Sequence, residues 1–224
     1  MLARAPFPSS RMPSKPSALW PEALSLTVLF LLLALLPSLS VLLEYQREAI
    51  RAGELWRLFT GHFAHLNLAH AVMNAAGTVL VSMLFVREIR RWQWWVLVLA
   101  APVVISLGLW FKQPGLHGYA GFSGVLHALL YFGVARMLVS APLLAGSILL
   151  LLIGRQVWEQ TAFYNPEYLR HWINGRVMPD AHLFGGATGL LLGGCTLWQD
   201  YRAGRLGKAR SSGYSSGTGP TPDA

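Results

Sequence analysis

Long apolar runs limit how this chain can fold more than any other feature. The first extends from Pro21 to Leu43 and contains a single charged residue, Glu22. A bilayer core is crossed by about 20 apolar helical residues. Five further runs of roughly this length follow, namely Leu66–Val86, Trp94–Phe111, Gly121–Val139, Pro142–Val157 and Ala181–Trp198. The sequence therefore predicts an all-α, polytopic membrane protein with a bundle of six transmembrane helices.

The charge content supports lipid as the solvent for much of the surface. Only 12% of the 224 residues are charged and 54% are hydrophobic, whereas a soluble domain carries about 25% charged residues. A net charge of +8 would suggest nucleic acid as the partner of a soluble protein. Here most of the basic residues lie between and outside the apolar runs, so we predict a bilayer partner and no nucleic acid. The single cysteine, Cys195, excludes an intrachain disulfide.

The distribution of basic residues predicts the orientation of the bundle. With six spans, four basic segments fall on one side, and they contain Arg4, Arg11, Lys15, Arg87, Arg90, Arg91, Arg136, Arg202, Arg205, Lys208 and Arg210. The positive-inside rule then places both termini in the cytoplasm (N-in/C-in). We predict a disordered N-terminal tail over residues 1–19, a membrane domain over 20–198 and a basic, disordered tail over 199–224. The first run is too long for the core of a signal peptide, so we expect a retained helix.

Polar residues concentrate in the first turns of the second, fourth and sixth runs. The second run holds His65, His70 and Asn74 at or near its start, the fourth holds Ser123, and the sixth begins beside His182. These three helices would all enter the bilayer from the outer side. Since polar groups inside a membrane are costly and usually functional, we expect one functional layer near the outer surface.

Glycines at helical spacing predict a close contact between the fourth and sixth helices. Small residues four apart let two membrane helices approach closely. The expected contact involves Gly121 and Gly124 on the fourth helix and Gly185 and Gly189 on the sixth. Such a contact would carry His182 toward Ser123.

This pairing suggests nucleophilic chemistry. A serine hydroxyl becomes a useful nucleophile when a neighbouring base takes its proton, and His182 would be that base for Ser123. Acyl transfer also requires donors directed at the developing oxyanion. The side chains of His70 and Asn74 and the backbone N–H of Ser123, free near a helix start, are the expected donors.

No acidic third member is expected beside this pair. Asp180 should face away from His182 on a helix, and Glu159 would reach the site only if its loop folded back. A Ser–His dyad is therefore predicted. His127, four residues after Ser123, is either an alternative base or a ring that packs beside the base.

Each of these residues also has a purely structural interpretation. A serine in a membrane helix usually bonds a backbone carbonyl, and a histidine at a helix start can lie at the interface. The histidines could also bind metal, as in a transporter, but there is no His-Glu-x-x-His motif. Moreover, His65 and His70 do not share a helix face. We therefore predict no metal and no cofactor.

Three motifs in order resemble the rhomboid family of intramembrane serine proteases. They are Trp56-Arg57 followed by His65-x4-His70-x3-Asn74, then Gly121-Phe122-Ser123-Gly124, then Ala181-His182-x2-Gly185-x3-Gly189. The resemblance covers about residues 54–195. It implies that Ser123 is the nucleophile, His182 the general base, and His70, Asn74 and the Ser123 N–H the oxyanion hole.

The chain departs from the family at His127, where rhomboids commonly carry a tyrosine that stacks on the catalytic histidine. This departure, with Val157–Gln160 and Ile173–His182, is similar to the rhombosortase branch. That resemblance implies membrane-anchored substrates with a C-terminal Gly-Gly sorting signal, an apolar helix and a basic tail. It also implies a multi-pass protein of the bacterial inner membrane with its active site facing the periplasm. The alternative is a catalytically inactive rhomboid-like protein that binds membrane clients.

Overall fold

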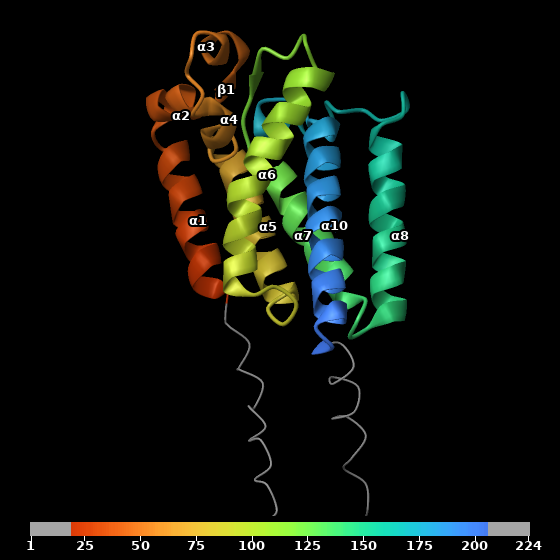
Figure 1. Ribbon diagram of the computed structural model, residues 1–224. Helices are drawn as coiled ribbons and strands as arrows, with labels where there is room; N and C mark the ends of the chain where they lie inside the picture. The colour runs from red at the N-terminus through yellow and green to blue at the C-terminus, as the bar shows by residue number, and fades with distance from the viewer. Residues whose placement is uncertain (1–18, 206–224) are drawn as a thin grey trace, which may run out of the picture.

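The protein is a bundle of long helices with a layer of short elements at one end. A computed structural model describes residues 19–205, in which the long helices lie side by side and α2, α3, α4 and β1 gather at one end of the bundle (Figure 1). The helices are α1 (Trp20–Ala34), α2 (Pro37–Leu43), α3 (Arg47–Arg51), α4 (Arg57–Thr60), α5 (Leu68–Leu84), α6 (Arg91–Lys112), α7 (Ser123–Met137), α8 (Pro142–Glu159), α9 (Arg170–Ile173) and α10 (Pro179–Arg202). Strands β1 (Tyr45–Gln46) and β2 (Gly118–Tyr119) pair antiparallel.

The first apolar run is broken, contrary to the single helix that we predicted. α1 ends at Ala34, and α2 starts at Pro37 with a bend of 109°. Proline lacks a backbone N–H, and it disfavours helical conformation in the residue before it. The chain therefore turns at Pro37, and α2 lies in the end layer.

The predicted number of spans is only partly supported. α6 and α8 are long and apolar enough to cross a membrane, and α1 with α2 would add a third crossing if the bent pair is one span. α5 has 17 residues and α7 has 15, less than the roughly 20 of a full span. The arrangement with six spans and both termini inside stays a prediction, although α1 starts and α10 ends at the same end of the bundle (Figure 1).

The predicted tails lie mostly outside the described residues. At the C-terminal boundary, α10 continues four residues past the predicted limit of 198 and ends at Arg202. Its last turns are tied to the bundle, because Asp200 pairs with Arg136 at 2.6 Å and with Arg205 at 2.8 Å. α10 therefore extends into the start of the segment that we assigned to the tail.

Two buried arginines hold the end layer together. Arg57 donates to the carbonyl oxygens of Val41 and Glu44 at 2.8 and 2.9 Å, which joins α4 to the end of α2. Arg47 donates to several carbonyl oxygens around the end of α6, including that of Gln113 at 2.8 Å. Hydrogen bonds from a charged donor to otherwise unpaired carbonyls stabilise a loop strongly. Arg57 of the Trp56-Arg57 motif thus has a structural role in the end layer.

α7 is the central helix and packs most closely on α10. A Cβ built on Gly185 would lie 1.9 Å from the carbonyl oxygen of Gly124, and one built on Gly189 would lie 2.2 Å from that of Ala128. No side chain fits at such distances, so the two backbones are in direct contact. The glycine spacing in the sequence predicted this contact for Gly124, Gly185 and Gly189.

Candidate active site

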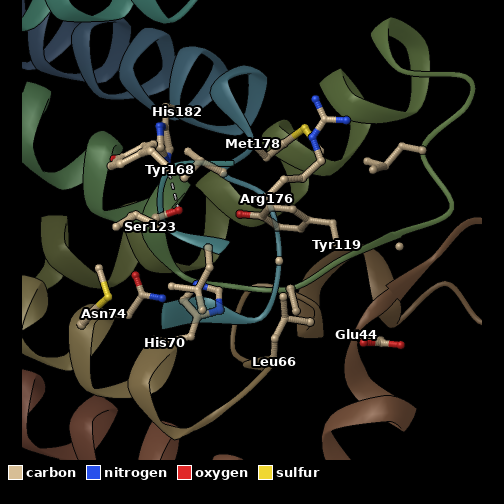
Figure 2. A pocket seen from close by; sticks show the side chains of 18 residues that line it. Glu44, Leu66, His70, Asn74, Tyr119, Ser123, Tyr168, Arg176, Met178 and His182 are labelled. Carbon is tan, nitrogen blue, oxygen red and sulfur yellow. Dashed lines mark hydrogen bonds between the residues drawn. The ribbon is translucent and has the colours of Figure 1, made fainter. Parts of the chain in front are cut away.

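The close contact of α7 with α10 brings Ser123 and His182 together. Ser123 is the first residue of α7, and His182 lies in the first turn of α10, which begins at Pro179. The Oγ atom of Ser123 is 3.1 Å from Nε2 of His182 (Figure 2). Proline is well suited to the first turn of a helix, where its missing N–H costs nothing. The sequence placed these two residues at the same depth, and the structure places them within hydrogen-bonding distance.

A cavity of about 440 Å³ opens beside this pair. His70 and Asn74 from α5 form one wall, opposite the loop that leads into α10 (Figure 2). The apolar side chains that line it are Leu66, Met73, Leu116, Leu169, Ile173, Val177 and Met178. A mostly apolar pocket with a few convergent polar groups is the usual form of a binding site. Sequence reasoning missed the loop wall, because its residues follow no helical or strand periodicity.

Two side-chain nitrogen atoms of α5 at this wall have no hydrogen-bond partner among the described residues. α5 starts where the Asn67 side chain accepts a hydrogen bond from the His70 N–H at 2.8 Å, an N-cap that fixes the first turn. In the described part of the chain, Nδ1 of His70 and Nδ2 of Asn74 are buried without a partner. Buried polar atoms are nearly always paired, so unpaired ones need an explanation. A role as hydrogen-bond donors to an oxyanion that forms during a reaction would explain why these atoms have no partner here.

Gly121 has a different role from the one that we predicted. It lies before α7 and faces His70 instead of α10, since a Cβ built on it would be 2.7 Å from the His70 ring. Its φ of +129° is a conformation that side chains rarely adopt. The Tyr119 hydroxyl donates to its carbonyl oxygen at 2.8 Å, and burial raises the pKa of that hydroxyl, so the proton stays in place. Gly121 thus lets the backbone pass directly over the His70 ring.

The far side of His182 contacts a carboxylate, which the sequence analysis did not predict. Oε2 of Glu159 lies 3.0 Å from Nδ1 of His182. No loop needs to fold back, because Glu159 is the last residue of α8 and this helix ends level with the start of α10. Asp180 instead bonds Lys112 at 2.6 Å, so it faces away from His182 as predicted. The expectation that His182 lacks an acidic partner was wrong.

His127 packs against His182 and is not positioned as a base. The two rings are stacked at 4.0 Å with an angle of 12° between their planes. Nδ1 of His127 is 2.8 Å from the carbonyl oxygen of Ser123, whereas the Ser123 hydroxyl lies beside His182. The geometry therefore favours His182 as the base and the packing role for His127.

We expect His127→Ala to lower kcat/KM about tenfold and His127→Tyr to leave it within about threefold. An aromatic pair contributes about 0.5–1.5 kcal/mol, and 1.4 kcal/mol corresponds to a factor of ten. Tyrosine keeps a flat ring over His182, while alanine leaves the imidazole free to turn. Steady-state kinetics of the purified variants, in the cleavage reaction that the resemblance to rhomboids implies, measure both values. Complete loss in His127→Ala, with its fold intact, would instead assign a proton-transfer role to His127.

The other histidines near the site act as packing groups. The edge of the His65 ring lies against His70, with ring centres 5.1 Å apart, so it supports the α5 wall from behind. His62 is fully buried, and its Nε2 is 3.0 Å from Oγ of Ser106. Within residues 19–205, no group of three or more potential metal-ligating side chains comes together.

Comparison with known families identifies the family of the chain. A model of the Rhomboid domain matches residues 52–199, which is well over half of the chain. The chain belongs to the Rhomboid family. Rhomboid proteins are membrane proteins and are generally intramembrane serine proteases, so the resemblance seen in the sequence is confirmed at this level. The match covers Ser123, His182 and the α5 wall. A search of curated proteins found no match to the chain.

Proposed function

We propose that this Rhomboid protein is an intramembrane serine endopeptidase with Ser123 as nucleophile and His182 as general base. The observation that carries the proposal is the 3.1 Å approach of Ser123 Oγ to His182 Nε2 at the wall of a cavity. An inactive, client-binding relative would have no need to keep both groups in reactive alignment beside unpaired donors.

The chemistry follows from the positions of these groups. Ser123 Oγ attacks the scissile carbonyl carbon while its proton passes to Nε2 of His182. The carbonyl oxygen becomes negative, and His70, Asn74 and the N–H of Ser123 donate to it. The C–N bond then breaks as His182 gives its proton to the leaving amine. Water, activated by His182, attacks the acyl-enzyme, and the Oγ–C bond breaks to restore the hydroxyl.

We further propose that the substrate is an exported protein held in the membrane by a C-terminal sorting signal of the Gly-Gly type. The resemblance to the rhombosortase branch supports this class. A helix must unwind to place a carbonyl beside Ser123, and glycine gives up helical conformation more readily than other residues except proline. In this proposal the protein lies in the bacterial inner membrane and its cavity faces the periplasm.

Labelling by a fluorophosphonate probe tests the nucleophile without knowledge of the substrate. We expect the wild type to be labelled at Ser123 and Ser123→Ala to be unlabelled. Ser140→Ala is the matched control, because Ser140 is exposed in the turn that follows the end of α7. Co-expression with a membrane protein that ends in a Gly-Gly signal then tests processing. Binding of an uncleaved client, with no label on Ser123, would favour the inactive alternative.

Asn74→Ala is expected to lower kcat about 10²–10³-fold while KM changes little. Removing one oxyanion donor typically has this effect, because the donor acts mainly in the transition state. The matched control is Gln199→Ala, which removes an exposed amide at the other end of the bundle. Cleavage rates at saturating substrate provide the measurement. A change confined to KM would show that Asn74 binds substrate in the ground state instead.

A further inference from the structure

Glu159 is a buried carboxylate with two directed contacts. Its side chain is 2% exposed. Oε2 is 3.0 Å from Nδ1 of His182, and Oε1 is 2.9 Å from a guanidinium nitrogen of Arg155, one helical turn earlier. A charge removed from water is costly unless it is paired and hydrogen-bonded. Arg155 and His182 supply these partners, so Glu159 is held as a carboxylate directed at the imidazole.

The neighbours of Glu159 fix its direction. The Arg155 guanidinium lies over the rings of Trp158 and Tyr164, at 4.8 and 5.3 Å from their centres. Cation–π contacts of this kind hold an arginine in place. Gln156 lies beside the carboxylate, with its Nε2 at 3.4 Å from both Oε2 of Glu159 and the carbonyl oxygen of Pro179. These contacts therefore hold the Glu159 carboxylate in the orientation that faces His182.

Resting on the proposed function, we propose that Glu159 is a positioning residue that completes a Ser123–His182–Glu159 triad. A carboxylate that accepts the Nδ1–H bond selects the tautomer whose Nε2 is free to take the serine proton. The same carboxylate stabilises the imidazolium that forms when the proton arrives. It touches neither the substrate nor the serine, and it acts only through His182.

A purely structural role is the competing interpretation, because the same contact also joins α8 to α10. The two roles differ in what they change. A positioning carboxylate affects kcat at an unchanged fold, whereas a tie between helices affects unfolding and substrate binding. Glu159→Gln separates them, since glutamine keeps the size and some hydrogen bonding. It loses the charge, and its amide group can impose the wrong tautomer on His182.

We expect Glu159→Gln to lower kcat at least about 100-fold with KM within about threefold, and Glu159→Asp to recover part of the loss. The control is Glu167→Gln, which removes a carboxylate paired with Arg170 three residues away, outside the cavity. Unfolding in detergent is followed for all variants. A Glu159→Gln enzyme with wild-type kcat overturns the proposal, as does a loss of kcat that parallels a loss of folded protein.

A spectroscopic test keeps this inference separate from the proposed function. The Nδ1–H proton of His182, held by a carboxylate, should appear in the proton NMR spectrum of the full-length protein as a resonance downfield of the amide region. We expect it in wild type and in Ser123→Ala, and we expect its loss in His182→Ala and Glu159→Gln. Its absence from wild type refutes the contact whether or not the protein cleaves anything. A protein that shows it but does not label or cleave refutes the protease function alone.

Discussion

Replacing His182 with alanine should lower kcat at least about 10³-fold and should stop fluorophosphonate labelling of Ser123. The reason is the position of Nε2, which lies 3.1 Å from the serine oxygen at the wall of the cavity. Without that nitrogen, the hydroxyl proton has no acceptor when the carbon–oxygen bond forms. Losses of this size follow the removal of the base from other serine hydrolases, where the remaining activity comes from the oxyanion hole and binding.

The measurement is the cleavage rate of the purified protein in detergent, with the labelling rate as a second readout. His171→Ala is the matched control, because His171 is exposed in the short helix α9. It should cleave at the wild-type rate. Wild-type rates in His182→Ala, with a normal unfolding curve, would contradict the assignment of the base and would direct attention back to His127.

The second large effect is expected from Gly185→Ala, which should reduce the free energy of unfolding by about 3 kcal/mol or more. Overpacking usually costs about 1–3 kcal/mol, and the cost rises where nothing can move aside. A methyl group on Gly185 would meet the backbone carbonyl of Gly124 at 1.9 Å. Backbone cannot swing away like a flexible side chain, so α10 must separate from α7. His182 would then withdraw from Ser123, and activity should fall with stability.

Gly194→Ala is the control on the same helix. A Cβ on Gly194 meets nothing within 4 Å, so this change should stabilise the protein by up to about 1 kcal/mol through the higher helix propensity of alanine. Denaturant unfolding in detergent compares the two variants. Equal effects from both would show that helix propensity, and not contact between backbones, governs this part of α10.

The Ser123–His182 pair could be predicted because its signals are local and periodic. Glycines four apart, polar first turns and alternating helix directions all follow from simple counting along the chain. Glu159 could not be assigned in this way. Its contact with His182 depends on the end of α8 lying beside the start of α10, and residue periodicity does not show where two helices lie relative to each other. The break at Pro37 did have a signal in the sequence, since proline ends helices, but the apolar run on both sides concealed it.

Gly121 shows a second limit of pattern reasoning. Its spacing in the Gly-Phe-Ser-Gly motif suggested a helix contact like that of Gly124, but a positive φ places it outside the helix, facing the His70 ring. Small residues serve both close packing and unusual backbone conformations, and a sequence alone does not distinguish these uses. The cavity wall between α9 and α10 could not be predicted either, because tertiary contacts determine the path of an irregular segment.

α8 stands at the side of the bundle (Figure 1), and its buried residues are Ala145, Gln156 and Glu159. Two of these three lie near its end, close to His182, while most of the helix faces outward. Farther from this end, the Tyr131 hydroxyl donates to the carbonyl oxygen of Leu152 at 2.8 Å, so the contact with His182 is one of several attachments of the helix. If the end of α8 tilted away from α10 and opened the side of the bundle, the Glu159 carboxylate would move away from the His182 imidazole. Opening the bundle at this side and keeping the contact between Glu159 and His182 would then exclude each other.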